Sequence, residues 1–253
     1  MEKREIQFAG GKKARAVLAP VRAGADELAQ ALDLPGSKVV ILLTGGAGLM
    51  EQSDEARLQA LFTDGLASAA SALDALIIDG GTESGVMALM GRGVAQQEQK
   101  PILLGISPEG KVSYPGKAGG VGEDETGPLD PNHAYFVLVE TDQWGGETAV
   151  MYELGQFFSR GRPSVAVLVN GGDIARNEVL YNVRQKRPII VIEGSGRLAD
   201  EIASQWRQKN IPASDQTLAE VVKDGNIHLF PLTGTPQQLK QLLFDLLRRQ
   251  LPR

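Results

Sequence analysis

Glycine-rich turns that each follow a short apolar run are the segments of this sequence best suited to bind a ligand. They read TGGAG at 44–48, GGTESGVM at 80–87, GGET at 145–148, NGGD at 170–173 and GSGR at 194–197. A buried strand that ends in glycines and continues into a helix brings backbone N–H groups and the positive helix end close to an anion. Several such turns at one edge of a sheet therefore predict a site for a phosphate-bearing ligand.

Two of the charged residues in these turns, Arg197 and Glu147, could contact a ligand directly. Arg197 would add a charge-assisted hydrogen bond to an anion at the start of a helix. The alternative is an ordinary turn capped by Ser195, in which Arg197 pairs with Asp200 or Glu201. Glu147 would lie in the first turn of a helix, where the helix dipole stabilises an ionised carboxylate. We therefore expect Glu147 to accept a hydrogen bond from a ribose hydroxyl, unless it is only a favourable charge at a helix end.

Fingerprints of known nucleotide sites are incomplete in this chain. The GxxxxGK spacing at 105–111 is that of a P-loop, but Val112 stands where a serine or threonine would hold Mg²⁺. The GxGxxA spacing at 194–199 matches a dinucleotide fingerprint, but no acidic residue stands clearly at the end of the following strand to hold a ribose. A NAD-dependent oxidoreductase therefore remains one alternative.

The chain has few of the residue types that bind metals or act as nucleophiles. The chain has no cysteine and two histidines, His133 and His228, both of which we expect to be structural. No Ser-His-Asp set and no pair of carboxylates can be assembled from spacing alone. We therefore predict no metal site and no cofactor, and the sequence indicates binding more strongly than any particular reaction.

Composition and charge limit the class of protein. Of the 253 residues, 42% are hydrophobic and 23% charged, and the net charge is −5. These values are typical of a globular protein with a sizeable core, and the lack of a basic stripe argues against nucleic acid as a partner. No stretch approaches the length of a membrane-spanning helix, and the amino terminus lacks the apolar region of a signal peptide. We therefore expect a cytoplasmic protein without membrane insertion, folded as a single domain over residues 1–253.

Short apolar runs rich in β-branched residues alternate with segments of helical periodicity. The runs are continuous, which indicates strands buried on both faces of a parallel sheet. Capping residues place helices at 85–97, 174–184 and 237–249, whereas the glycine- and proline-containing segment 107–132 is expected to be a functional flap or a mobile loop. We predict an α/β protein with a Rossmann-like, doubly wound, mainly parallel sheet and helices on both faces. The predicted strands are 16–19, 39–43, 75–78, 102–105, 135–140, 165–169, 189–192 and 227–230.

In their order along the chain, the turns and their flanking residues resemble the SLOG superfamily, and within it the branch related to the N-terminal domain of TRPM cation channels. The motifs are TGGAG at 44–48, DGGTESGVM at 79–87, LLGISPEG at 103–110, LDPNHAYFVLV at 129–139, WGGE at 144–147 and EGSGRLAD at 193–200. The resemblance implies a Rossmann-like domain that binds a nucleotide-derived small molecule in the cleft formed by these loops. The ligand class in TRPM relatives includes ADP-ribose. Relatives commonly oligomerise, which leaves a homo-oligomer open.

The resemblance also suggests an enzymatic alternative. LOG-type members of the superfamily cleave the N-glycosidic bond of nucleoside monophosphates and use a P-G-G-x-G-T-x-x-E loop. Near Gly145 and Gly146, Val150 stands in place of that glutamate, and Met151 replaces an arginine of the TRPM-like pattern. The expected function is binding or sensing of the ligand, and the alternative is a phosphoribohydrolase that uses Glu147.

Four of the turns receive a role in the predicted site. We expect the turns at 44–48 and 80–87 to hold phosphates, the turn at 145–148 to hold a ribose, and the turn at 194–197 to hold a second phosphate or a terminal ribose. The predicted ligand-binding residues are Thr44, Gly45, Gly46, Gly48, Gly80, Gly81, Thr82, Ser84, Gly85, Val86, Met87, Gly145, Gly146, Glu147, Thr148, Gly171, Gly194, Ser195, Gly196 and Arg197.

Overall fold

A computed structural model describes residues 1–46, 52–117, 126–209 and 214–251, with the backbone alone for 52–55. The strands of its main sheet are β1 (Glu2–Gln7), β2 (Lys13–Ala19), β3 (Val39–Gly45), β4 (Ala75–Asp79), β5 (Ile102–Pro108), β8 (Tyr135–Val139), β9 (Ser164–Val169), β10 (Ile189–Glu193) and β11 (Ile227–Pro231). Within the described residues they form one nine-stranded sheet in the order β1-β2-β8-β5-β4-β3-β9-β10-β11. Only the β1–β2 pair of this sheet is antiparallel.

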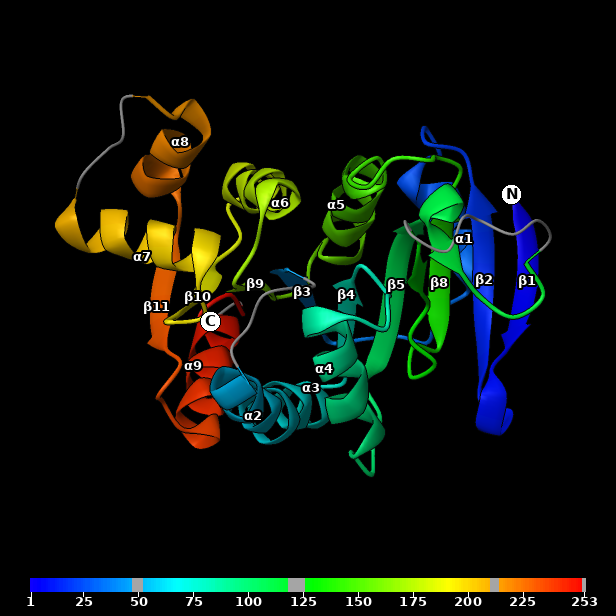
Figure 1. Cartoon of the computed structure of the whole chain (residues 1–253), viewed down its shortest axis with the longest axis horizontal. Helices are drawn as coiled ribbons and strands as arrows, with labels where there is room; N and C mark the ends of the chain where they lie inside the picture. Colours follow the sequence, from blue (N-terminus) through cyan, green and yellow to red (C-terminus); the bar gives the residue numbers. More distant parts are fainter. Residues whose placement is uncertain (47–51, 118–125, 210–213, 252–253) are drawn as a thin grey trace.

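Helices cover both faces of this sheet (Figure 1). One face carries α1 (Ala25–Leu32), α5 (Thr148–Phe158), α6 (Asp173–Arg184), α7 (Arg197–Gln208) and α8 (Gln216–Asp224). The other face carries α2 (Gln52–Ala60), the π-helix η2 (Leu61–Ala67), α3 (Ser68–Ala72), α4 (Gly85–Ala95) and α9 (Pro236–Arg248). The predicted Rossmann-like α/β architecture, with a mainly parallel sheet between two helical layers, is confirmed.

Continuous apolar runs form the central strands because both of their faces are covered. Every residue of β4 is buried, as are the first six residues of β3, and Ile41 lies beside Ile77 in the parallel register. A strand in this position gains from apolar side chains on both faces, so alternation is not needed. All eight predicted strands are present, with boundaries that differ by a few residues.

The order of the strands reverses at β3. From β3 the chain moves outward in one direction through β4, β5 and β8, and it then returns to the other side of β3 to form β9, β10 and β11. The helices that follow β3 and β9 lie on opposite faces of the sheet (Figure 1). In open α/β sheets, such a reversal leaves a crevice at the carboxyl ends of the strands where ligands bind.

Two regions differ from the sequence-based prediction. The strand β1 was missed because its EKREIQ sequence is polar and only Ile6 is buried. The segment 107–132 was predicted to be a flap or mobile loop, but its described residues include regular structure: β5 continues to Pro108, and β6 (Val112–Ser113) pairs in parallel with β7 (Gly127–Pro128). Val112 and Leu129 join a third hydrophobic cluster beside β1 and β2, which explains this regular structure.

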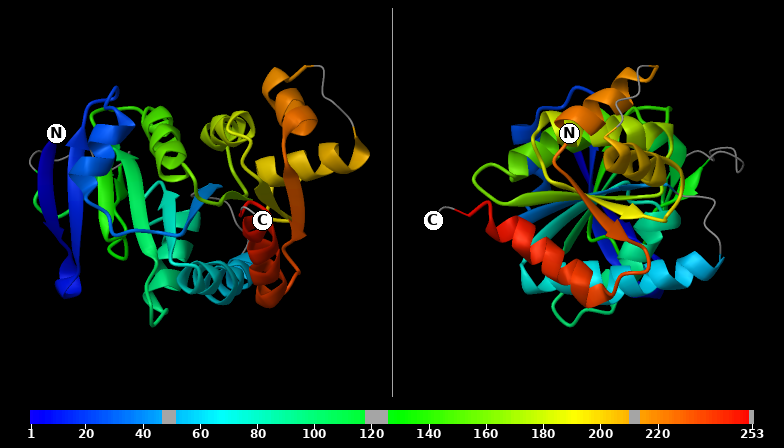
Figure 2. Two further views of the ribbon diagram at one scale, coloured as in Figure 1. Left: turned by 180° about the vertical axis from the view of Figure 1, so that it is seen from behind. Right: turned by 90° about the vertical axis from the view of Figure 1, so that its left-hand side faces the viewer.

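The two ends of the chain lie in different parts of the fold. The amino terminus lies at one edge of the sheet, and α9 leads to the carboxyl terminus (Figure 2). Within the described parts of the chain, no helix combines the length and the apolar character that crossing a membrane requires.

Candidate functional site

The loops that follow β3, β9 and β10 meet at the reversal point of the sheet. A β-carbon built on Gly46 would stand 3.3 Å from Oδ1 of Asn170 and 3.6 Å from Nη1 of Arg197. A β-carbon on Gly172 would stand 2.6 Å from Nη2 of Arg197. Because both glycines lack a side chain, the guanidinium group lies directly against the two loops, beside the amino ends of α6 and α7.

Arg197 is held in a conformation that ordinary residues avoid, and it is exposed. Its φ is +48°, in the left-handed region, where a residue other than glycine is strained. Neither partner expected for an ordinary turn is available, because Asp200 accepts a hydrogen bond from the N–H of Gly194 and Glu201 pairs with Arg176. Across the described residues, Arg197 has no side-chain hydrogen bond or ion pair. This guanidinium group is therefore suited to bind an anion.

Asn170 and Ser195 fix the loops after β9 and β10 to each other. The hydroxyl of Ser195 accepts a hydrogen bond from the N–H of Asn170 (2.8 Å) and donates to the carbonyl of Ile192 (2.6 Å). Asn170 Nδ2 donates to the carbonyl of Ser195 at 3.0 Å. Ser195 is buried and does not cap α7, whose N-cap is Gly196. Its hydroxyl joins the two loops instead.

The loop after β4 lies against the end of β3. A β-carbon on Gly45 would stand 2.8 Å from Cγ2 of Val86, so the two segments touch. The hydroxyl of Thr82 is buried and pairs with Oγ of Ser84 at 2.9 Å. The N–H of Gly81 donates to the aspartate that ends β4 at 2.8 Å. These hydrogen bonds lie within the loop and the end of β4.

Buried carboxyl groups lie beneath the loops. Glu147 at the start of α5 is 6% exposed, its Oε2 has no hydrogen-bond partner among the described residues, and burial raises its pKa to about 7. Glu178 on α6 is also buried, and its pKa is raised to about 8. Desolvation is the largest cause, and the nearby carboxylates of Glu147 and Asp79 add to it. Carboxyl groups that hold protons near neutral pH are able to act as acids or bases toward a ligand.

A buried hydrogen-bond network supports this cluster from below. Oγ1 of Thr44 lies 2.7 Å from Oη of Tyr152, which accepts a hydrogen bond from Nδ2 of Asn182 at 3.3 Å. Oδ1 of Asn182 accepts from Nη1 of Arg187 at 2.6 Å, and burial lowers the pKa of Arg187 to about 10. The buried side chain of Thr44 therefore belongs to a hydrogen-bond network that joins β3 to α5 and α6.

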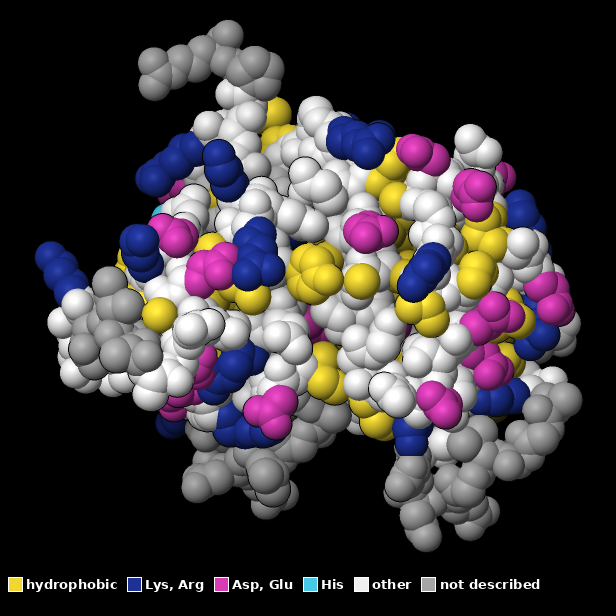
Figure 3. Space-filling view, turned by 90° about the horizontal axis from the view of Figure 1, so that it is seen from above, with side chains coloured by type: hydrophobic (Ala, Val, Ile, Leu, Met, Phe, Trp, Pro, Cys, Tyr) yellow, Lys and Arg dark blue, Asp and Glu magenta, His cyan; other side chains and the backbone are white. Residues whose placement is uncertain are grey.

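A groove of about 570 Å³ continues from these loops between α5 and α6. Trp144 and Ile174 line it and are 42% and 38% exposed, which is unusual for side chains of their size. A β-carbon on Gly127 would stand 3.3 Å from Thr82 and 3.5 Å from the indole of Trp144, so the groove adjoins the loop after β4. Hydrophobic side chains lie in the middle of this face, among charged side chains of both signs (Figure 3).

The predicted ligand-binding residues separate into a surface set and a buried set. Exposed or half-buried are Gly45, Gly46, Gly80, Ser84, Gly85, Met87, Gly145, Gly146, Gly194, Gly196 and Arg197. Buried are Thr44, Gly81, Thr82, Val86, Glu147, Thr148, Gly171 and Ser195. Gly48 lies outside the described residues. The surface set consists mostly of glycines, and the buried residues pack beneath them.

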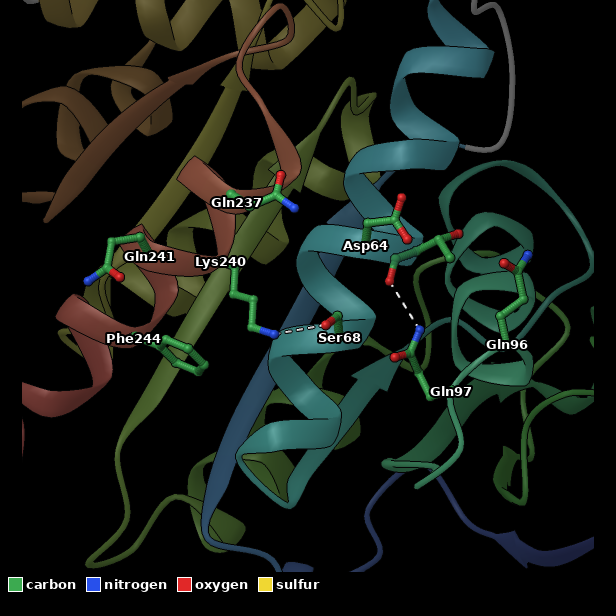
Figure 4. A pocket seen from close by; sticks show the side chains of 9 residues that line it. Asp64, Ser68, Gln96, Gln97, Gln237, Lys240, Gln241 and Phe244 are labelled. Atoms are coloured by element: carbon green, nitrogen blue, oxygen red, sulfur yellow. Dashed lines mark hydrogen bonds between the residues drawn. The ribbon is translucent and has the colours of Figure 1, made fainter.

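A second cavity, of about 660 Å³, lies among η2, α4 and α9 on the other face of the sheet (Figure 4). Nζ of Lys240 donates to Oγ of Ser68 at 2.9 Å, and Nε2 of Gln97 donates to the carbonyl of Thr63 at 3.1 Å. Its described lining includes none of the predicted site residues. The loops at the reversal point are therefore the better candidate for the functional site.

Comparison with known proteins agrees with the motifs at this site. A family model described as "SLOG in TRPM, prokaryote" matches residues 38–241. This chain belongs to that SLOG family. It is 30% identical over 221 residues to "Transient receptor potential cation channel subfamily M member 2" of Mus musculus, and this covers 74% of the chain but 14% of the channel.

Other channels of the same type are similar over comparable lengths. The SLOG chain is 30% identical over 206 residues to the "subfamily M member-like 2" channel of Nematostella vectensis, covering 68% of the chain and 13% of the channel. It is 26% identical over 255 residues to subfamily M member 7 of Homo sapiens, covering 84% of the chain and 13% of the channel. The chain thus matches only a small part of each channel.

Glu178 is a residue that the sequence analysis missed, although its spacing gave a signal. Gly171, Gly172 and Glu178 have the spacing of the two adjacent glycines and the glutamate in the LOG-type SLOG loop, whereas Ile174 and Ala175 replace the third glycine and the threonine. Glu178 therefore follows the glycine pair of the loop after β9 and lies on α6, whereas the glycine pair at 145–146 precedes α5. Trp144, Asp79 and Asn170 were also not among the predicted site residues.

Proposed function

We propose that this SLOG protein binds a nucleotide-derived ligand, ADP-ribose-like or phosphoribosyl, at the carboxyl ends of β3, β4, β9 and β10. Membership of the family supports a ligand of this type. The observation that carries the proposal is the Arg197 guanidinium group, which lies against the backbone of Gly46 and Gly172 without a side-chain partner in the described chain. An anionic phosphate would satisfy it together with the amino ends of two helices.

The rest of the ligand is assigned from the surfaces that adjoin Arg197. The exposed indole of Trp144 offers an aromatic face for a base in the groove between α5 and α6. Glu147 is the N-cap residue of α5 and follows Gly145 and Gly146, which line this groove. Its Oε2, which has no hydrogen-bond partner among the described residues, would accept a hydrogen bond from a ribose. This arrangement favours a ligand that combines a phosphate, a ribose and a base.

The test is a binding screen with ADP-ribose, NAD, cyclic nucleotides and nucleoside monophosphates, followed by calorimetry. We expect at least one of these compounds to raise the melting temperature. Arg197→Ala should weaken its binding by about 1.5–3 kcal/mol, because a hydrogen bond to a charged group is lost. Arg248→Ala, an exposed arginine of α9, serves as the matched control. Equal affinities of both variants would exclude Arg197 from the site.

A second candidate function, hydrolysis of an N-glycosidic bond, is favoured by Glu178. Glu178 and Glu147 are buried, the charge of Glu147 contributes to the raised pKa of Glu178, and the pKa values of the two carboxyl groups are raised to about 8 and about 7. A hydrolase would release free base and ribose phosphate from a nucleoside monophosphate, with turnover lost in Glu178→Gln or Glu147→Gln. If the nucleotides are unchanged after long incubation, the hydrolase candidate is excluded and ligand binding is the only proposed function that remains. The oxidoreductase alternative gains no support, because β11 ends at Pro231 without an acidic residue for the ribose.

A further inference from the structure

The segment 128–133, which contains the first five residues of the LDPNHAYFVLV motif, forms backbone contacts with the loop that follows β4. Thr82 forms an antiparallel bridge with Leu129, and the N–H of Glu83 donates to the carbonyl of Pro128 at 2.7 Å. The N–H of Asp130 donates to the carbonyl of Gly81 at 2.9 Å. These backbone contacts involve residues 81–83 of the turn, and His133 follows the same segment.

His133 lies between two carboxylates. Its Nε2 is 2.8 Å from Oδ1 of Asp79, and its Nδ1 is 3.2 Å from Oδ1 of Asp130. All three side chains are buried, and the imidazole ring stacks on Phe136 with centroids 5.5 Å apart. Burial disfavours the imidazolium form, but Asp79 and Asp130 outweigh it and raise the pKa of His133 to about 9. At neutral pH both ring nitrogens therefore carry protons and donate.

Asp79 transmits this interaction to the turn. Oδ1, the oxygen that faces His133, also accepts the N–H of Gly81 at 2.8 Å. Gly81 has a φ of +71°, and a β-carbon there would stand 2.8 Å from Cα of Gly105, so the turn has one tightly packed conformation. Asp79 is also near Glu178 on α6, and its charge adds to the rise in the pKa of Glu178 that burial and Glu147 cause.

We infer that His133 is a positioning residue of the ligand site: its imidazolium holds Oδ1 of Asp79, and Asp79 holds the glycine turn after β4 in the conformation that the ligand meets. The inference rests on the proposed function. His133 is buried, so it would act on the ligand only through Asp79 and the turn. The imidazolium places a counter-charge beside the buried Asp79, where an uncompensated charge would be costly. A neutral side chain at 133 would leave two buried aspartates without a counter-charge.

The experiment compares His133→Gln with His228→Gln, the other histidine of the chain, which lies half-buried on β11. Amide hydrogen exchange and ADP-ribose affinity are measured on both variants and on the wild type. In His133→Gln we expect the amide of Gly81 to exchange about tenfold faster and the affinity to fall about tenfold, while the amides of β3 and β9 keep their protection. His228→Gln should match the wild type in each measurement.

A wild-type measurement keeps the inference testable if His133→Gln does not fold. Nitrogen-15 shifts of the imidazole ring should show both nitrogens of His133 protonated at pH 7, and a neutral ring would overturn the inference. So would a folded His133→Gln with unchanged Gly81 exchange and affinity. If the wild type binds neither ADP-ribose nor the other compounds of the screen, the proposed function fails, and the site role of His133 fails with it. Binding by the wild type that His133→Gln retains in full overturns the inference alone.

Discussion

The guanidinium group of Arg197 lies directly over Gly172, with Nη2 2.6 Å from the place where a β-carbon on that glycine would stand. Gly172 has an extended φ of −116°, which other residues adopt readily, so its backbone does not require glycine. The contact instead involves the end of a flexible side chain. Glycine at 172 is therefore explained by the position of Arg197 rather than by the fold.

Gly172→Ala should separate ligand affinity from stability. The added methyl group would push the guanidinium group away, and we expect ADP-ribose affinity to fall by about 1–2 kcal/mol, as for a lost charge-assisted hydrogen bond. The free energy of unfolding should change by less than about 1 kcal/mol, because Arg197 can move. Calorimetry and urea denaturation measure the two quantities. Gly36→Ala is the control, since no atom lies within 4 Å of a β-carbon there.

Gly45→Ala, unlike Gly172→Ala, should mainly lower the free energy of unfolding. A β-carbon on Gly45 would stand 2.6 Å from the carbonyl oxygen of Val169, a backbone atom of the neighbouring strand. The strands cannot move apart without loss of packing, so we expect a loss of about 1–3 kcal/mol in the free energy of unfolding. Urea denaturation of Gly45→Ala beside Gly36→Ala checks this. Equal stability of the two variants would show that the end of β3 is more adaptable than its contacts indicate.

The buried acids predict a protein that becomes less stable as the pH rises. The pKa values of Glu147 and Glu178 increase from an ordinary value of 4.5 to about 7 and about 8, so the folded state keeps protons that the unfolded state has released. The free energy of unfolding then falls with pH between about 4.5 and 8, by up to about 1.4 kcal/mol per pH unit for each group. His133 acts in the same direction, because stability present below pH 6.5 is lost as the pH rises through about 9.

Glu178→Gln tests this pH dependence. The amide resembles the protonated acid and cannot ionise, so the variant should be more stable than the wild type at pH 9 and similar to it at pH 5. Urea denaturation at pH 5, 7 and 9 gives the three free energies. Glu98→Gln removes an exposed carboxylate and is the control. Parallel curves for the wild type and Glu178→Gln would mean that Glu178 does not retain its proton in the folded state.

Short-range patterns predicted eight strands of the main sheet and placed Arg197 at the start of a helix, whereas β1 and the contacts between distant residues were missed. The apolar run at β4 and the position of Arg197 at the start of α7 can be read from a few neighbouring residues. The contacts of Asp79 with His133 and of Thr44 with Tyr152 join residues 54 and 108 positions apart. They depend on which strands become neighbours and how each helix is rotated, which periodicity alone does not determine.

Glu178 shows how a local pattern can be noticed in the wrong place. The glycine pairs at 145–146 and 171–172 both precede helices, and only the second is followed by a glutamate at the spacing of the LOG-type loop. The reversal of strand order between β3 and β9 also favours the second pair, because such a reversal leaves a crevice at the carboxyl ends of these strands.

Trp144 provides the prediction that distinguishes a nucleotide from a simple phosphosugar. Its indole is 42% exposed at the mouth of the groove between α5 and α6, where it would stack on a base. Trp144→Ala should weaken ADP-ribose binding by about 1–3 kcal/mol, the range for stacking of one base on an aromatic ring, and leave ribose 5-phosphate binding unchanged. Trp144→Phe keeps an aromatic face and should retain most of the affinity. Calorimetry with both ligands on the three proteins measures the difference. If Trp144→Ala weakens both ligands equally, the indole acts by supporting the loop at Gly127 and not by holding a base, because only that contact is shared by the two complexes.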